Sequence, residues 1–88
     1  MKSKELNKAF TEAVEKMNNY TAPLPADLLL RLYAYYKIAT KDNSSPKSKR
    51  PLINAFKINA LFQARNVTEK EAKEKYIALV EEYFKTKA

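Results

Sequence analysis

Residues 26–40 read ADLLLRLYAYYKIAT, and this stretch decides the fold. Its apolar side chains follow helical spacing but lie nearly all round the helical wheel: Leu28, Leu29, Leu30, Leu32, Tyr33, Tyr35, Tyr36, Ile38 and Ala39. A helix that is apolar on every side is either central to a bundle or lines something besides the core. The stretch therefore predicts a helix over residues 26–40 that has neighbours on more than one side.

Residues 3–19 carry one apolar stripe. Its members follow helical spacing, with Lys and Glu between them: Leu6, Ala9, Phe10, Ala13, Val14 and Met17. This pattern predicts an amphipathic helix with one buried face. The next segment, residues 20–25, contains Pro23 and Pro25, which disfavour helical geometry at the residues before them. It is predicted to be a connecting loop.

Two more helices are predicted in the second half of the chain. Pro51 suits the first turn of a helix, which we expect over residues 51–65. Thr68 and Glu71 have the T-x-x-E spacing of a capping box, so a last helix starts at Thr68 or Glu69 and continues to about Lys85. Its stripe is Ala72, Tyr76, Leu79, Val80 and Tyr83. Four helices without a strand signal predict an all-α bundle, and 88 residues allow one domain, residues 1–88.

Four residue types are missing from the chain, Trp among them, and the absence of the other three excludes some chemistry. There is no Cys, no His and no Gly. Without Cys there is no disulfide, thiol catalysis or thiolate metal site, and without His there is no imidazole base, Ser-His-Asp triad or HExxH zinc site. Without Gly, no Gly-rich loop can bring its backbone against a pyrophosphate. We therefore expect a protein that is not an enzyme and holds no metal and no cofactor.

The chain is basic, with a net charge of +7 at pH 7. The segment 41–57 alone carries +4, because Asp42 is outnumbered there by Lys41, Lys47, Lys49, Arg50 and Lys57. This segment includes residues 41–51, which we expect to form an exposed basic loop. A basic chain favours an anionic partner, which can be nucleic acid, a membrane surface or a phosphorylated small molecule.

No export signal and no membrane span are expected. The first residues, MKSKELNKAF, lack the continuous apolar stretch of a signal peptide. The longest apolar run, residues 28–39, is interrupted by Arg31 and Lys37 and is shorter than the roughly 20 residues of a membrane span. The sequence therefore predicts a cytoplasmic protein without stable membrane insertion.

Tyr33, Tyr36 and Lys37 are spaced i, i+3 and i+4, so two phenol rings and one ammonium group share a face of their helix. One interpretation makes the tyrosines core residues, with Lys37 reaching out to solvent. With Tyr35 between them, however, the three rings cannot all point into one core. Some of them must line a groove or the surface.

Lys57 and Tyr76 are also open to two interpretations. Lys57 stands among apolar neighbours and can be an exposed residue between core positions, while Tyr76 fits the core stripe of the last helix. Taken together with the tyrosines and Lys37, however, they supply aromatic faces and ammonium groups. These are the two elements of nucleotide recognition.

Residues 32–40, LYAYYKIAT, resemble the motif LYALYKQAT of the acyl-CoA-binding protein family, and seven of the nine positions match. The resemblance extends over nearly the whole chain through Phe10, Ala13, the loop with two prolines, Arg50-Pro51, Lys57, Ala72 and Tyr76. It implies an antiparallel four-helix bundle that holds one long-chain acyl-CoA ester without reacting it.

The resemblance also implies which residues bind the ligand. The nucleotide end would be held by Tyr33, Tyr36, Lys37, Lys57 and Tyr76, with Lys57 meeting the 3′-phosphate region. The less polar parts of the ligand would pack on Val14, Leu29 and Leu30. The chain departs from the family pattern at several positions: Asn18 stands where a basic residue is frequent, Ile38 replaces Gln, Lys41-Asp42 replace Gly-Asp, and Ile58 and Leu61 replace aromatic residues.

We therefore expect a monomer that binds, buffers and delivers long-chain acyl-CoA esters, with acyl-CoA-using enzymes as further partners and without a nucleic-acid partner. One alternative is a small basic helical module that binds nucleic acid, and a weaker one is a structural interaction domain. Against the nucleic-acid alternative, the charge gathers in one loop and does not follow a recognition helix.

Overall fold

The computed structural model describes residues 3–41 and 51–87. These residues form four helices and, within the described ranges, no strand, which confirms the all-α prediction. Each predicted boundary is matched to within two residues. The prolines at 23 and 25 lie in the predicted loop, and the turn after residue 63 ends the third helix two residues early. The helices are α1 (Ser3–Asn18), α2 (Ala26–Ala39), α3 (Pro51–Gln63) and α4 (Glu69–Lys87).

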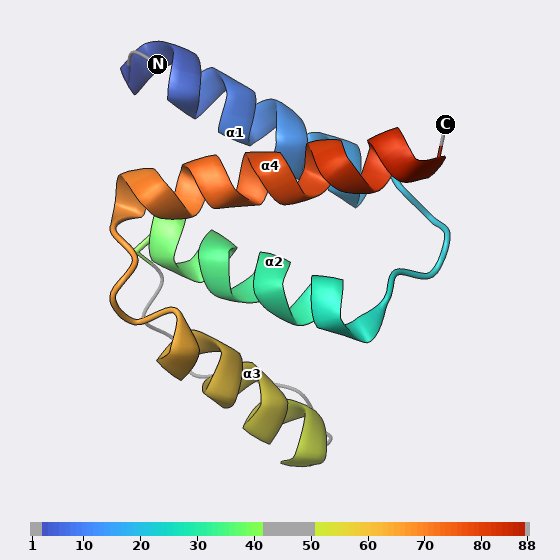
Figure 1. Ribbon diagram of the computed structural model, residues 1–88, viewed down its shortest axis with the longest axis vertical. Helices are drawn as coiled ribbons and strands as arrows, with labels where there is room; N and C mark the ends of the chain where they lie inside the picture. Colours follow the sequence, from blue (N-terminus) through green and yellow to red (C-terminus); the bar gives the residue numbers. More distant parts are fainter. Residues whose placement is uncertain (1–2, 42–50, 88) are drawn as a thin grey trace.

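The helices follow one another across the molecule in the order α1, α4, α2, α3 (Figure 1). α4 packs against both α1 and α2, while α3 packs against α2. α1 and α4 run in one direction, and α2 and α3 run in the opposite direction (Figure 1). The loop lengths explain these directions, because the short connections after α1 and after α3 favour a reversal of the chain, whereas the long segment from 40 to 50 lets α3 follow the direction of α2.

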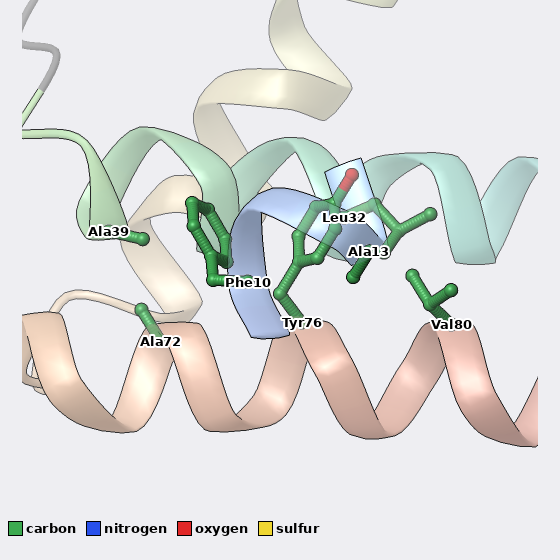
Figure 2. Close-up of a cluster of buried hydrophobic side chains, with 7 residues drawn as sticks. All are labelled: Phe10, Ala13, Leu32, Ala39, Ala72, Tyr76 and Val80. Carbon is green, nitrogen blue, oxygen red and sulfur yellow. The ribbon is translucent and has the colours of Figure 1, made fainter. Parts of the chain in front are cut away.

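The core lies between α1, α2 and α4, and it combines small and aromatic side chains (Figure 2). Ala72 is fully buried on α4, and three further alanines of the core helices are almost as buried, so the helices can approach closely. The Phe10 ring meets the Tyr76 ring edge-on, with the centroids 5.2 Å apart. The buried members of the cluster are Phe10, Ala13, Leu32, Ala39, Ala72, Tyr76 and Val80. They include Phe10 and Ala13 of the predicted α1 stripe and Ala72, Tyr76 and Val80 of the predicted α4 stripe, while Val14, Met17 and Leu79 are partly buried and pack against the cluster.

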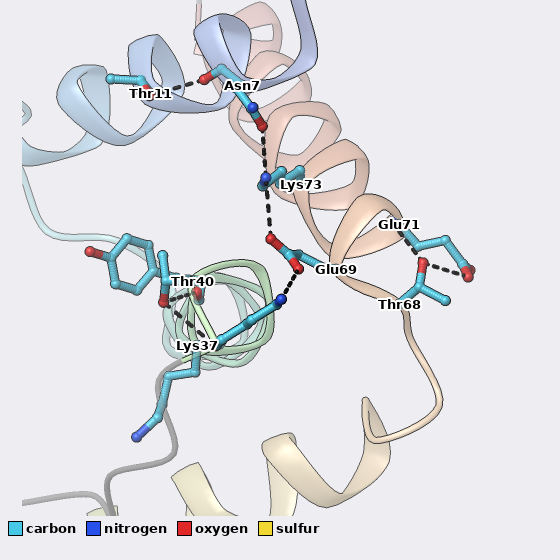
Figure 3. Close-up of polar contacts among 10 residues, drawn as sticks. Asn7, Thr11, Lys37, Thr40, Thr68, Glu69, Glu71 and Lys73 are labelled. Carbon is cyan, nitrogen blue, oxygen red and sulfur yellow. Dashed lines mark hydrogen bonds and ion pairs between the residues drawn. The ribbon is translucent and has the colours of Figure 1, made fainter. Parts of the chain in front are cut away.

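The start of α4 is fixed by Thr68, as the capping-box spacing predicts. The Thr68 hydroxyl accepts a hydrogen bond from the Glu71 backbone N–H at 3.1 Å, which satisfies one of the free donors of the first turn. The same hydroxyl donates to the Glu71 carboxylate at 3.0 Å (Figure 3). This cap ends the turn after α3 and sets the direction in which α4 leaves.

A chain of polar contacts ties one end of the bundle together. The Glu69 carboxylate pairs with the Lys41 ammonium at 3.3 Å and with the Lys73 ammonium at 3.5 Å, and Lys73 donates to the Asn7 side-chain oxygen at 2.7 Å (Figure 3). The hydrogen bond from Lys41 lowers the pKa of Glu69. Because Glu69 is solvated, this network contributes little stability and mainly links the ends of α1, α2 and α4.

Lys41 itself has a left-handed backbone, with φ at 56° directly after α2. This conformation suits glycine, and it costs a side-chain-bearing residue about 1 kcal/mol. The motif resemblance puts a glycine of the family at this position, so the backbone explains the family's preference. In this chain the Lys41 side chain makes the ion pair with Glu69 instead.

The loop between α1 and α2 is held against the end of α4. The Tyr20 and Tyr83 hydroxyl groups are 3.2 Å apart, and the Tyr20 ring lies edge-on to the Phe84 ring with the centroids 5.1 Å apart. The loop therefore has a fixed course from α1 to α2, and Leu24, which lies within it, is half-buried. None of the helices, over their described residues, is long and apolar enough to cross a bilayer.

Candidate functional site

A cleft of about 400 Å³ opens between α1, the following loop, α2 and α4. α2 supplies one face of it, because Leu29, Leu32, Tyr33 and Tyr36 follow each other at i, i+3, i+4 and i+7. The described residues that line it are Val14, Met17, Asn18, Leu24, Leu29, Leu32, Tyr33, Tyr36 and Tyr76. Among their side chains, only the Asn18 amide and the three phenols carry N–H or O–H groups, so the cleft is suited to a largely apolar ligand segment.

The cleft brings together five of the eight predicted site residues: Val14, Leu29, Tyr33, Tyr36 and Tyr76. Lys37 and Lys57 adjoin it through Tyr33, as described below. Leu30 is half-buried on α2 and does not line the cleft. The apolar side chains on the different sides of α2 thus have two roles, since Leu32 and Ala39 face the core while Leu29 and Tyr36 face the cleft.

The three neighbouring tyrosines of α2 divide between cleft and core, as the sequence predicts. Tyr36 is 40% exposed and stacks on Phe10, with ring centroids 6.2 Å apart and planes inclined by 25°. Tyr33 also lines the cleft, whereas Tyr35 packs against the core cluster. One face of the Tyr36 ring is therefore supported from below by Phe10, which is the arrangement that stacking of a flat ligand group requires.

Two ammonium groups lie over the ring of Tyr33. The Lys57 Nζ from α3 is 4.9 Å from the ring centroid, and the Lys37 Nζ from α2 is 5.4 Å from it. Lys37 is only 6% exposed, and Lys57 is half-buried. Both cations are attracted by the negative face of the ring. Because burial strengthens their electrostatic interactions, they form a positive site around Tyr33, which itself lines the cleft.

The hydroxyl group of Tyr33 is buried and has no hydrogen-bond partner within the described part of the chain. Leaving such a group unsatisfied costs about 1–3 kcal/mol. Buried polar groups are satisfied in nearly all folded proteins, and an exception calls for an explanation. A ligand atom that accepts a hydrogen bond from this hydroxyl would supply one.

Tyr76 closes the cleft from the α4 side and is 5% exposed. Burial raises the pKa of its phenol, and the neighbouring Tyr36 raises it further. The proton is thus held more tightly in the folded protein than in the unfolded chain. The raised pKa therefore adds to the free energy of unfolding, and this contribution is fully present below pH 10, the ordinary pKa of the phenol. It is lost as the pH rises through the raised pKa of the folded state.

We therefore expect the free energy of unfolding to fall more steeply above pH 10 in the wild type than in Tyr76→Phe. Urea unfolding between pH 8 and pH 11 measures this difference. The two proteins differ only in the hydroxyl group of residue 76, so the comparison isolates the phenol. Parallel curves for the two proteins would mean that Tyr76 reaches solvent freely.

Four cleft residues were not predicted as site residues. Met17 and Leu32 belong to apolar stripes, so the sequence places them in the core and carries no signal for a second role. Asn18 falls at a position where the family frequently has a basic residue, and this departure from the family pattern could have marked Asn18 as a site residue. Leu24 lies in the loop, where periodicity has no meaning, and only its large apolar side chain between two prolines distinguishes it.

The remaining chemistry of the site is simple. Within residues 3–41 and 51–87, no group of His, Cys, Asp or Glu side chains could hold a metal ion. The cleft lining contains no carboxylate. What the geometry offers is an apolar cleft, a supported aromatic face and two partly desolvated cations.

Comparison with known protein families gives one match. The family model described as acyl CoA binding protein matches residues 7–80, which span the cleft residues from Val14 to Tyr76 and also Lys37 and Lys57. The search of curated proteins and the search of solved structures each found no match.

Proposed function

This chain belongs to the acyl-CoA binding protein family, and we propose that it binds one long-chain acyl-CoA ester, which it buffers and transports without reacting it. Binding of acyl-CoA is the general property of the family, whose members are not enzymes. Transport, buffering and the residues that hold the ligand are our proposal. It extends to a single binding domain, residues 1–88, that acts as a cytoplasmic monomer and exchanges its ligand with acyl-CoA-using enzymes.

The observation that carries the proposal is the pair of lysines over the ring of Tyr33, a residue that lines the apolar cleft. CoA carries roughly four negative charges, and its phosphates need cations that are not fully solvated. Lys37 and Lys57 meet that need at 5.4 and 4.9 Å from the Tyr33 ring centroid. In this proposal Lys57 contacts the 3′-phosphate region and Tyr36 stacks on the adenine ring.

The apolar residues would hold the other parts of the ligand. Val14, Leu29 and Tyr76 line the cleft and are assigned to the pantetheine and the first part of the acyl chain. Burial of the chain contributes about 0.8 kcal/mol per methylene group, so a long chain adds several kcal/mol. Leu30 remains a predicted ligand contact, and it would have to act from outside the cleft lining.

The absence of a reaction is also a proposal, and the chemistry of the cleft supports it. Hydrolysis of a thioester needs an activated nucleophile and a base within hydrogen-bond reach of it. The described lining residues offer phenols and one amide, and none of them carries a carboxylate that could serve as a base. The lining groups would therefore contact the bound thioester without catalysing its hydrolysis.

Titration calorimetry tests the proposed ligand. We expect one palmitoyl-CoA per chain and at least about a hundredfold weaker binding of palmitate, because palmitate forfeits two charge-assisted contacts worth roughly 1.5–3 kcal/mol each. Free CoA should bind weakly, which measures the nucleotide end alone. A DNA oligomer of equal charge serves as the test of the nucleic-acid alternative. Equal affinities for palmitate and palmitoyl-CoA, or tighter binding of the oligomer, would refute the proposal.

A further inference from the structure

α3 exposes three large apolar side chains that the ligand site does not use; Ile58 and Phe62 share one outer face of the helix, and Phe56 lies on another side of it. Phe56 is 48% exposed, Ile58 55% and Phe62 60%. The other large apolar residues that are exposed in the described ranges are Leu29 and Tyr36, and both line the cleft. α3 packs against α2 and stands apart from α1 and α4 (Figure 1). Its outer face is therefore available to something outside the chain.

Positive charge accompanies this apolar face. α3 contains no acidic residue, and the sequence between Asp42 and Glu69 contains none either. The Arg65 guanidinium lies 4.0 Å from the centroid of the Phe62 ring and donates to the Phe62 carbonyl oxygen at 2.8 Å. An exposed aromatic ring and a cation thus occupy the same spot at the end of α3. Ile58, one helical turn before Phe62, continues the apolar surface.

We propose that the outer face of α3 docks on an anionic membrane surface. Side chains such as Ile58 and Phe62 gain free energy by entering the boundary between headgroups and acyl chains, and Arg65 is attracted by acidic headgroups. The 13 residues of α3 are too few to span a bilayer, so the helix would lie in the plane of the interface. A second copy of the chain is a poorer occupant, because two surfaces of chains with a net charge of +7 repel each other.

This inference goes beyond the proposed ligand binding, and its test needs no ligand. The chain has no tryptophan, so Phe62→Trp introduces a single fluorescent reporter on the docking face. With vesicles of phosphatidylcholine and phosphatidylserine, its emission should shift to shorter wavelength, and with phosphatidylcholine alone the shift should be much smaller. Ala78→Trp, at an exposed position of α4, is the matched reporter and should not shift. Equal shifts at both positions, or a shift at neither, would overturn the proposal.

A second experiment removes the docking face without changing the charge. The double variant Ile58→Ser/Phe62→Ser should lower vesicle co-sedimentation by about tenfold or more, because two exposed apolar side chains are lost. Arg65→Gln should lower it by about fivefold, and Lys75→Gln, an equal loss of charge on α4, should have a smaller effect. Unchanged co-sedimentation of the double variant would mean that binding is electrostatic only and not through α3.

Two controls keep the result unambiguous. Far-ultraviolet circular dichroism and binding of hexanoyl-CoA without vesicles should be the same for the double variant and the wild type, since neither residue lines the cleft. Analytical ultracentrifugation tests the other occupant. Self-association of the wild type that the double variant lacks would assign the face to a dimer, and so overturn the membrane proposal.

Discussion

Lys57→Met is expected to weaken binding of palmitoyl-CoA by about tenfold to a hundredfold, because a charge-assisted contact to a phosphate is worth roughly 1.5–3 kcal/mol. Methionine keeps the apolar stem that covers the Tyr33 ring but removes the ammonium group 4.9 Å from the ring centroid. The melting temperature should change little, since this side chain lies half-exposed on α3. Titration calorimetry gives the affinity, and thermal unfolding gives the stability.

A ligand without the 3′-phosphate tests which phosphate Lys57 contacts. Palmitoyl-dephospho-CoA lacks the 3′-phosphate, and the affinities of the wild type and Lys57→Met for it should be nearly equal. Lys75→Met, which removes a cation from the exposed face of α4, controls for the change in net charge. If Lys57→Met leaves palmitoyl-CoA binding unchanged, the assignment is wrong, and Lys49 or Arg50, which lie outside the described residues, become the candidates.

The fold was largely predictable because its strongest signals are local. The stripes of α1 and α4 place Phe10 and Val80 in the core, where the structure has them, and the Thr68 spacing marks the start of α4 correctly. Each of these signals depends on residues within one or two helical turns. The motif on α2 added the family, which the match over residues 7–80 confirms.

The orientation of α3 could not be predicted in the same way. Apolar residues surround this helix, so periodicity does not distinguish Leu61, which is half-buried, from Ile58 and Phe62, which face outward. What decides the matter is which side meets α2, and that is a property of tertiary packing. The exposed face of α3 was for this reason visible only in the structure.

The candidate site was predictable in its residues and not in its electrostatics. Helical spacing puts Tyr33 and Lys37 on one face of α2, but it does not reveal that Lys37 is buried. Lys57 is 24 positions from Tyr33 in the sequence, and only the packing of α3 on α2 brings it to the same ring. Residues such as Val14 and Tyr76 fit the apolar stripes of their helices, so helical periodicity does not indicate that they also line the cleft.

Tyr33→Phe is expected to change stability and binding in opposite directions. The Tyr33 hydroxyl is buried without a hydrogen-bond partner among the described residues, so its removal should stabilise the free protein by about 1 kcal/mol, which corresponds to a rise in melting temperature of about 4–8 °C for a domain of this size. If the same hydroxyl donates to a ligand phosphate, its loss should weaken palmitoyl-CoA binding by about tenfold. The ring remains, so the contacts with Lys37 and Lys57 are retained.

Thermal unfolding with and without saturating palmitoyl-CoA separates the two effects. The free variant should melt above the wild type, while its ligand-induced shift should be smaller. Tyr35→Phe, two residues further along α2 and packed on the core, should leave the ligand-induced shift unchanged. Tyr33→Leu removes the ring as well, and it should reduce binding further because the cations lose their aromatic support. A lower melting temperature with an undiminished ligand shift in Tyr33→Leu would make Tyr33 a core residue and contradict the site, because removal of a ring that carries two cations in the ligand site must lower the affinity.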